Sequence, residues 1–125
     1  MKIIVSNSSG EPIYQQIVSQ LKEQILKGEL KAGHALPSIR NLAKELKVSV
    51  ITTKRAYEEL EREGFIETVQ GKGSFVAAYN NEILREKKYS IVEEKLVEAI
   101  LVAKSLDITQ DELINILQQL YEKEA

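Results

Sequence analysis

Residues 36–76, LPSIRNLAKELKVSVITTKRAYEELEREGFIETVQGKGSFV, contain the signals that decide the fold. Ser38 is a suitable N-cap for a short helix that reaches Leu46, and Ser49 is a suitable N-cap for a helix that runs to about Glu63. A serine hydroxyl at this position accepts a hydrogen bond from one of the first free N–H groups of the helix. Because only two residues separate the helices, the stretch predicts a helix-turn-helix.

The end of the same stretch predicts a β-hairpin. Phe65–Val69 and Ser74–Ala77 have the residue types and the partial alternation of short strands. Gly71 and Gly73 lie in the connection, where a tight hairpin turn needs positive φ angles.

A further helix is predicted upstream, from Pro12 to Lys27, with proline at the first helical position and Gly28 as the stop. Its apolar residues recur with helical spacing and form one stripe: Tyr14, Ile17, Val18, Leu21 and Ile25. Three helices followed by a hairpin are the order of a winged helix-turn-helix.

The chain changes character near 79–81, after which only helices are predicted. One helix is expected from Asn81 to Lys104, with a stripe of Val92, Leu96, Ala99, Ile100 and Ala103. Thr109 and Glu112 form a capping box for a last helix, whose apolar residues are Leu113, Ile116, Leu117, Leu120 and Tyr121. Two such helices cannot bury both stripes against each other alone, so a second copy of the chain is expected to cover them.

The predicted fold class is therefore mainly α with a small β-hairpin. Residues 1–78 are expected to form the winged helix-turn-helix domain and residues 79–125 a helical dimerisation region. The residues expected at the dimer interface are Val92, Leu96, Ile100, Leu113, Leu117 and Leu120.

The distribution of charge is more informative than the net charge of −2. Residues 38–55 carry five basic side chains and one acidic one, whereas residues 79–125 have a balance of −4. The basic segment can bind phosphates locally, while the acidic end is repelled by DNA. On charge alone, a solvated helix face explains the basic segment equally well.

Several functions are disfavoured by the sequence. The chain has no cysteine, which rules out disulfides and thiolate chemistry. It has no nucleotide-binding glycine motif and no metal-ligand spacing, so neither enzymatic activity nor a cofactor or metal is expected. No signal peptide or membrane span is predicted. His34 is expected to be an exposed loop residue, and Tyr14 and Tyr57 are expected to be core residues.

Residues 36–76, extended upstream by PIYQQIVSQLKEQILKGELKAG from Pro12, resemble the DNA-binding domain of the GntR family. The short two-helix tail resembles that of the YtrA subfamily. The wording AYEELEREG also occurs in the MocR subfamily, but that group continues into a large aminotransferase-like domain, for which 125 residues leave no room.

The resemblance implies a cytoplasmic bacterial regulator, usually a repressor, that binds a palindromic operator as a homodimer. YtrA-type regulators often control transporter genes, and a small-molecule effector is left open. The resemblance also implies which parts of the chain contact DNA: an arginine early in the second helix, the start of the third helix, and the tip of the wing.

Mapped onto this sequence, and supplemented by nearby polar and basic side chains, the expected DNA-binding residues are Ser38, Arg40, Lys44, Lys47, Ser49, Val50, Ile51, Thr52, Lys54, Arg55, Gln70, Gly71 and Lys72. Many members of the family have Arg where this chain has Val50 and Thr where it has Ile51. Without that arginine, an apolar contact from Val50 or Ile51 to a thymine methyl is the expected substitute. Arg40 is open to two roles, a phosphate contact or guanine recognition.

An alternative interpretation uses the same two apolar residues. Val50 and Ile51 on an outward helix face also suit a module that binds a partner protein rather than DNA.

Overall fold

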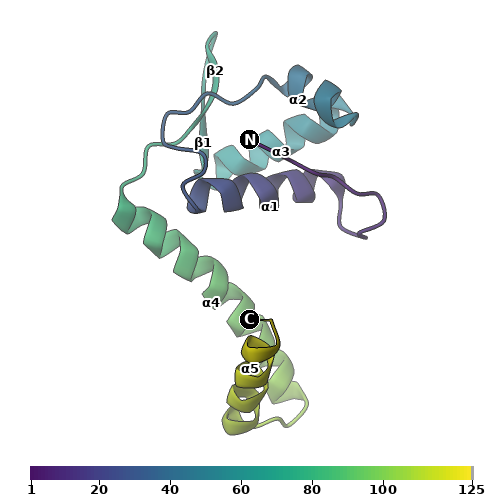
Figure 1. The fold of residues 1–125 in the computed structure, drawn as a ribbon, viewed down its shortest axis with the longest axis vertical. Helices are drawn as coiled ribbons and strands as arrows, with labels where there is room; N and C mark the ends of the chain where they lie inside the picture. The colour runs from purple at the N-terminus through teal and green to yellow at the C-terminus, as the bar shows by residue number, and fades with distance from the viewer. Residues whose placement is uncertain (125) are drawn as a thin grey trace. The chain divides into compact units, whose positions relative to one another are not determined.

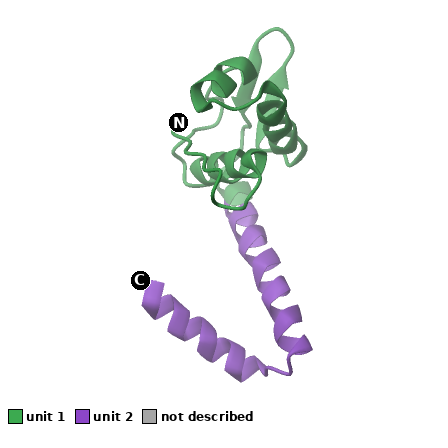
Figure 2. Cartoon of the chain, turned by 90° about the vertical axis from the view of Figure 1, so that its right-hand side faces the viewer, with its two compact units in different colours: residues 1–84 green, residues 85–125 purple. Residues whose placement is uncertain are grey.

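The computed structural model describes residues 1–124. The chain divides into two compact units, one of residues 1–84 and one that begins at residue 85 (Figure 2). The predicted order of three helices, a hairpin and two further helices is confirmed (Figure 1).

The first unit contains three helices: α1 (Ile13–Leu26), α2 (Ile39–Leu46) and α3 (Val50–Arg62). The two predicted N-caps are confirmed. The Ser38 hydroxyl accepts a hydrogen bond from the backbone of the third residue after it at 3.1 Å, and Ser49 does the same at 3.0 Å. These local bonds fix where α2 and α3 begin.

Two helix boundaries depend on single backbone conformations. Pro12 has a ψ of 143°, so it precedes α1 as the N-cap, and its prediction as the first helical residue is wrong by one position. Lys47 has φ 58° and ψ 44°, which ends α2 and turns the chain toward α3. A left-handed residue at this position is a common helix stop because it redirects the backbone within one residue.

The hairpin is formed by β1 (Ile66–Val69) and β2 (Gly73–Val76), paired antiparallel with Val69 opposite Gly73. A third segment, 33–36, pairs with β2: its backbone N–H groups donate to Ser74 and Val76 at 2.9 and 2.8 Å. No strand is predicted for this segment from its residues. The extra pairing fixes the base of the hairpin to the body of the unit.

The core of the first unit lies between α1, α3 and the base of the hairpin. Its fully buried side chains include Ile17, Leu21, Leu42, Leu60 and Ile66. Tyr57 is buried as predicted, and its hydroxyl donates a hydrogen bond to the Pro37 carbonyl at 2.7 Å. Burial raises the pKa of the Tyr57 phenol, with a smaller contribution from the negative charge of Glu45. The unit therefore has a closed core on which α3 rests.

The N-terminal segment is attached to α1 by a row of glutamines that sequence analysis did not single out. Gln16, Gln20 and Gln24 donate to the carbonyls of Ser6, Ile4 and Lys2 at 2.8, 2.6 and 2.7 Å. Four helical residues rise about 6 Å and two extended residues span about 6.6 Å, so the two repeats match in length. The segment adds Ile3 and Val5 to the edge of the core.

The second part of the chain contains α4 (Asn81–Ser105) and α5 (Gln110–Glu124). The predicted capping box is confirmed, because Thr109 and Glu112 bond each other's backbone N–H groups, both at 3.2 Å. Within the unit of residues 85–125, the two helices diverge from their connecting turn (Figure 2).

The prediction of a single apolar stripe on α4 is incomplete. Of its five predicted members only Ala103 is buried, and α4 also exposes Val97, Leu101 and Val102 on other faces. A helix that is apolar on several faces needs neighbours on several sides. None of the helices in residues 1–124 combines the length and the apolar character that a bilayer crossing requires.

Candidate nucleic-acid interface

The outward side of α3 is formed by Val50, Ile51, Thr52, Lys54 and Arg55, which we call the reading face. Ile51 is 81% exposed and Val50 47%, although both are large β-branched apolar residues. The opposite side of the helix is anchored in the core by Thr53, Ala56, Tyr57 and Leu60. The helix is therefore held rigidly with an apolar residue at its front.

The cap of α3 occupies the hydroxyl of Ser49, one of the predicted DNA-binding residues. The Ser49 hydroxyl accepts from the Thr52 backbone N–H at 3.0 Å and donates to the Thr52 hydroxyl oxygen at 2.8 Å. The proton of the Thr52 hydroxyl is left for an outside acceptor. Thr52 is half-buried at this edge of the reading face.

The basic side chains of the region are mostly unneutralised. Lys54 has a carboxylate partner at the limit of an ion pair, Glu58 at 4.0 Å, with both side chains exposed. Within residues 1–124, no carboxylate lies in ion-pair range of Arg40, Lys44, Lys47 or Arg55. Four positive charges on or beside the helix-turn-helix thus remain available for anions.

Arg55 has a partner of another kind. Its guanidinium carbon lies 3.8 Å from the centre of the Tyr14 ring, which belongs to α1. Tyr14 was predicted to be a core residue. The Tyr14 side chain is half-buried. It packs against the core, and its ring also contacts the Arg55 guanidinium. Helical periodicity identified the packing of Tyr14, but it could not identify a contact between two helices.

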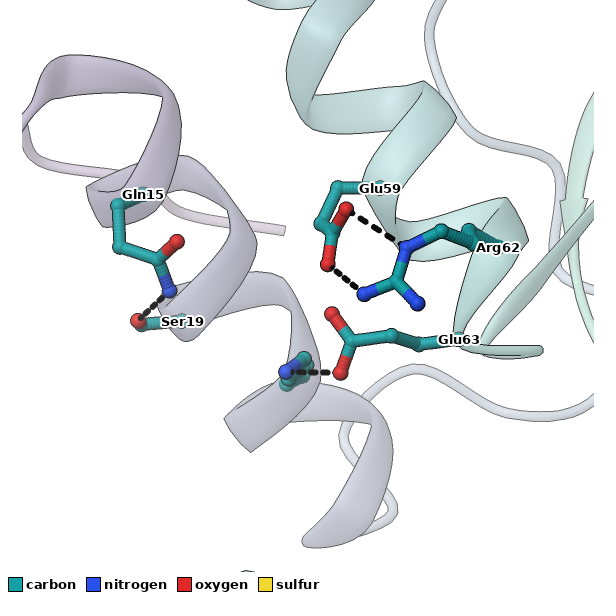
Figure 3. A network of polar contacts seen from close by, with 6 residues as sticks. Gln15, Ser19, Glu59, Arg62 and Glu63 are labelled. Carbon is teal, nitrogen blue, oxygen red and sulfur yellow. Dashed lines mark hydrogen bonds and ion pairs between the residues drawn. The ribbon is translucent and has the colours of Figure 1, made fainter.

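Toward the C-terminus of α3, acidic side chains are paired with basic ones, and Figure 3 shows Glu59 and Glu63 with their partners. Arg62 binds Glu59 through two N–H groups, and Lys22 of α1 binds Glu63 at 2.5 Å. The hydrogen bonds from Arg62, with the positive charges of Arg62 and Lys22, hold the pKa of Glu59 down at about 2. The helix is therefore basic toward its N-terminus and paired or acidic toward its C-terminus.

The tip of the hairpin carries Gln70, Gly71 and Lys72, all exposed. Gly71 has a φ of +78°, and nothing lies within 4 Å of the position that a Cβ would take. A glycine is thus favoured at position 71 by the positive φ angle and not by a lack of space for a side chain. The open space also lets another molecule approach the backbone closely.

The structure gathers the predicted DNA-binding residues in the first unit. Twelve of the thirteen are exposed and Thr52 is half-buried: Ser38, Arg40, Lys44, Lys47, Ser49, Val50, Ile51, Thr52, Lys54, Arg55, Gln70, Gly71 and Lys72. The predicted dimer residues lie in the second unit, where Leu113 is half-buried and the others are exposed: Val92, Leu96, Ile100, Leu113, Leu117 and Leu120.

His34 lies exposed in the loop before α2, as predicted. Among residues 1–124, no three His, Asp or Glu side chains come close enough together to hold a metal ion.

Comparisons with known proteins agree with this arrangement. The family described as bacterial regulatory proteins, gntR family, matches residues 13–76. The HTH-type transcriptional repressor YtrA of Bacillus subtilis (strain 168) is 42% identical over 101 residues, which cover 81% of this chain and 78% of YtrA.

Two solved structures extend the likeness. A transcriptional antiterminator from Listeria monocytogenes EGD-e superposes with a TM-score of 0.73 and 36% identity, covering 97% of this chain and 90% of that one. YtrA from Sulfolobus acidocaldarius, described as a GntR-family transcription factor, has a TM-score of 0.60 and 41% identity, covering 76% of this chain and 97% of its own. The predicted resemblance to the GntR family and its YtrA group is confirmed. The chain therefore belongs to the GntR family of bacterial regulatory proteins and is a DNA-binding transcriptional regulator.

Proposed function

We propose that the protein is a cytoplasmic repressor that binds a palindromic operator as a homodimer, with residues 1–78 on DNA and residues 79–125 pairing the chains. The observation that carries the proposal is the reading face, an exposed row of apolar and basic side chains on a helix anchored by its other side. A helix of this kind fits the major groove, where base edges are accessible.

The chemistry of the reading face suits a mixture of base and phosphate contacts. Ile51 presents an apolar surface suited to the methyl group of thymine. Thr52 has a hydroxyl proton to donate to a phosphate oxygen, and Arg55 has guanidinium donors. Lys44 and Lys47 add charge beside the helix, while Gln70 and Lys72 reach toward the minor groove from the wing.

The second unit supports pairing of two chains. Its helices expose Leu96, Ile100, Leu117 and Leu120 together, each at least 40% accessible. Several large apolar side chains exposed on one pair of helices are typical of an interface. A two-fold dimer would place two reading faces on one side of a duplex, matching the symmetry of a palindrome.

The proposals of repression and of the target genes are supported by the relatives alone. The Bacillus subtilis relative is named a repressor. By resemblance to its group, we propose transporter genes as the targets. A reporter fused to the promoter next to this gene should rise in activity when the gene is deleted.

The first experiment is a fluorescence-anisotropy titration against the duplex upstream of the protein's own operon. The expected result is salt-sensitive binding, with a sequence preference over random DNA. Lack of binding at low micromolar protein and low salt would refute the proposed function. Arg40→Ala decides the role of that residue. A loss of about 1–3 kcal/mol confined to the operator indicates base recognition, whereas equal loss on all DNA indicates a phosphate contact.

The methyl contact of Ile51 has a direct test. Replacing single thymines of each half-site by deoxyuridine removes one methyl group and leaves every hydrogen-bonding atom in place. At the contacted thymine the wild type should lose about 1 kcal/mol, and Ile51→Ala should lose nothing further. Equal sensitivity of both proteins would show that another residue makes the contact.

The exposure of Ile51 and Val50 also supports the second candidate, a surface for a partner protein. Ile51→Asp distinguishes the two functions. If the wild type does not bind its upstream DNA and Ile51→Asp abolishes the capture of a partner protein, the partner-binding function is favoured over operator binding.

A further inference from the structure

We infer that Tyr14 is a positioning residue for DNA binding: its ring holds the Arg55 guanidinium in place for a phosphate of the duplex. The inference rests on the proposed function and adds a residue of α1 to a surface otherwise formed by the helix-turn-helix and the wing.

The first step is the geometry of the pair. The guanidinium carbon of Arg55 lies 3.8 Å from the centre of the Tyr14 ring, a stacking distance. Tyr14 packs against the buried cluster that contains Ile17 and Leu21, so the ring is fixed by the core of the unit. A long side chain that is otherwise exposed is thereby restricted to few conformations.

The second step concerns the N–H donors and the charge of Arg55, which the contact with Tyr14 leaves available. The N–H donors of a guanidinium lie in its plane, and stacking on a ring uses its face. Arg55 has no carboxylate in ion-pair range within residues 1–124, and the first turn of α1 contains no acidic residue. The group is therefore held in place while its charge and its donors remain unused.

Arg62 on the same helix provides the contrast. Two of its N–H donors bind the Glu59 carboxylate (Figure 3), which neutralises the charge of this arginine within the protein. One arginine of α3 is thus neutralised, and the other is oriented but unpaired.

The third step is the location of Arg55. It lies one helical turn after Ile51, so both side chains share the face of α3 that is turned away from the core. When Ile51 meets a base edge, Arg55 comes beside the backbone that borders the groove. An arginine ordered before binding loses less conformational entropy when it meets a phosphate.

The test uses the full chain and its upstream duplex, with Tyr14→Leu as the main variant because leucine keeps the apolar packing and removes the aromatic face. Binding should weaken about two- to tenfold per half-site. Tyr14→Phe retains the stack and should bind as the wild type does. Arg62→Ala is the matched control and should leave binding unchanged. Thermal unfolding of each variant checks that the fold is intact.

A double-mutant cycle separates positioning from a structural effect. Arg55→Ala should lower the slope of log affinity against log salt by about one per half-site. In that background, Tyr14→Leu should change nothing further. Equal loss in Tyr14→Phe, or an undiminished effect of Tyr14→Leu without Arg55, would overturn the inference. Absence of salt-sensitive binding by the wild type would refute the proposed function and this role together.

Discussion

The two units of this protein differ in where their apolar residues lie: the first unit buries them and the second leaves most of them exposed. In residues 1–84, leucine, isoleucine and valine side chains from α1, α2, α3 and the hairpin meet in one buried cluster. In residues 85–125, α4 and α5 leave most of theirs exposed, and Ala103 is the only buried apolar residue among residues 85–124. Burial of apolar area is the main favourable term in folding. The first unit thus buries its apolar residues within one chain, whereas the second leaves an apolar surface exposed, as the proposed dimer requires.

The contrast agrees with the proposed division of the chain into a DNA-binding unit and a dimerisation unit. A DNA-reading helix must keep its shape before it meets the groove, so it needs a core of its own. In the proposed dimer the second unit needs no independent core, because the partner chain would supply the contacts that this unit lacks.

The largest effect is expected in the first core. Leu60→Ala removes a fully buried side chain of α3 and should lower the free energy of unfolding by about 2–5 kcal/mol. Urea unfolding followed by circular dichroism measures it, and the loss should be the same at every protein concentration. A loss that shrank as concentration rose would mean that the first unit also depends on a second chain.

The second unit should respond in the opposite way. Leu117→Asp places a charge in the proposed interface and should weaken dimerisation by about 2–4 kcal/mol, seen as monomers by light scattering. Gln118→Asp adds the same charge on the neighbouring, polar side of α5 and serves as the control. Equal dissociation by the control would indicate general repulsion rather than a specific interface.

A smaller effect tests the N-cap at which α3 begins. Ser49→Ala removes the hydroxyl that caps α3 and should cost about 1 kcal/mol of stability. Thr109→Ala removes the corresponding cap of α5 in the second unit. The first loss should be independent of protein concentration and the second should appear as weaker dimerisation, which equilibrium unfolding at two concentrations would resolve.

The smallest effect is a pH dependence confined to the first unit. Burial raises the pKa of Tyr57, so the unfolded chain ionises first, near pH 10. The stability contributed by the neutral phenol is therefore present below about pH 10 and is lost progressively as the pH rises above it. Unfolding free energies measured across this range should fall more steeply for the wild type than for Tyr57→Phe. Parallel curves would contradict the assignment.

Sequence reasoning succeeded where the controlling interaction is local. The caps at Ser38 and Ser49, the box at Thr109, and the glycine turn of the hairpin each depend on a few consecutive residues. Their predicted positions agree with the observed element ends to within one or two residues.

It failed where the controlling contact joins distant parts of the chain. The pairing of 33–36 with β2, the glutamine row on α1 and the Tyr14–Arg55 contact carry no local signal. The pattern used to find an apolar stripe assumes that a helix buries a single face. It therefore selected only some of the apolar residues of α4 and overlooked Leu101. The roles of individual residues on DNA depend on a molecule outside the chain, so they remain predictions.

The most direct test of the account is the mass of the complex formed on the upstream duplex, measured by sedimentation equilibrium. Two chains on each palindromic site, reducing to one weakly bound chain in Leu117→Asp, is the result we predict. If the wild type and Leu117→Asp each bound the duplex as a single chain with the same affinity, the result would contradict a regulator built from a self-sufficient DNA-binding unit and a shared helical interface.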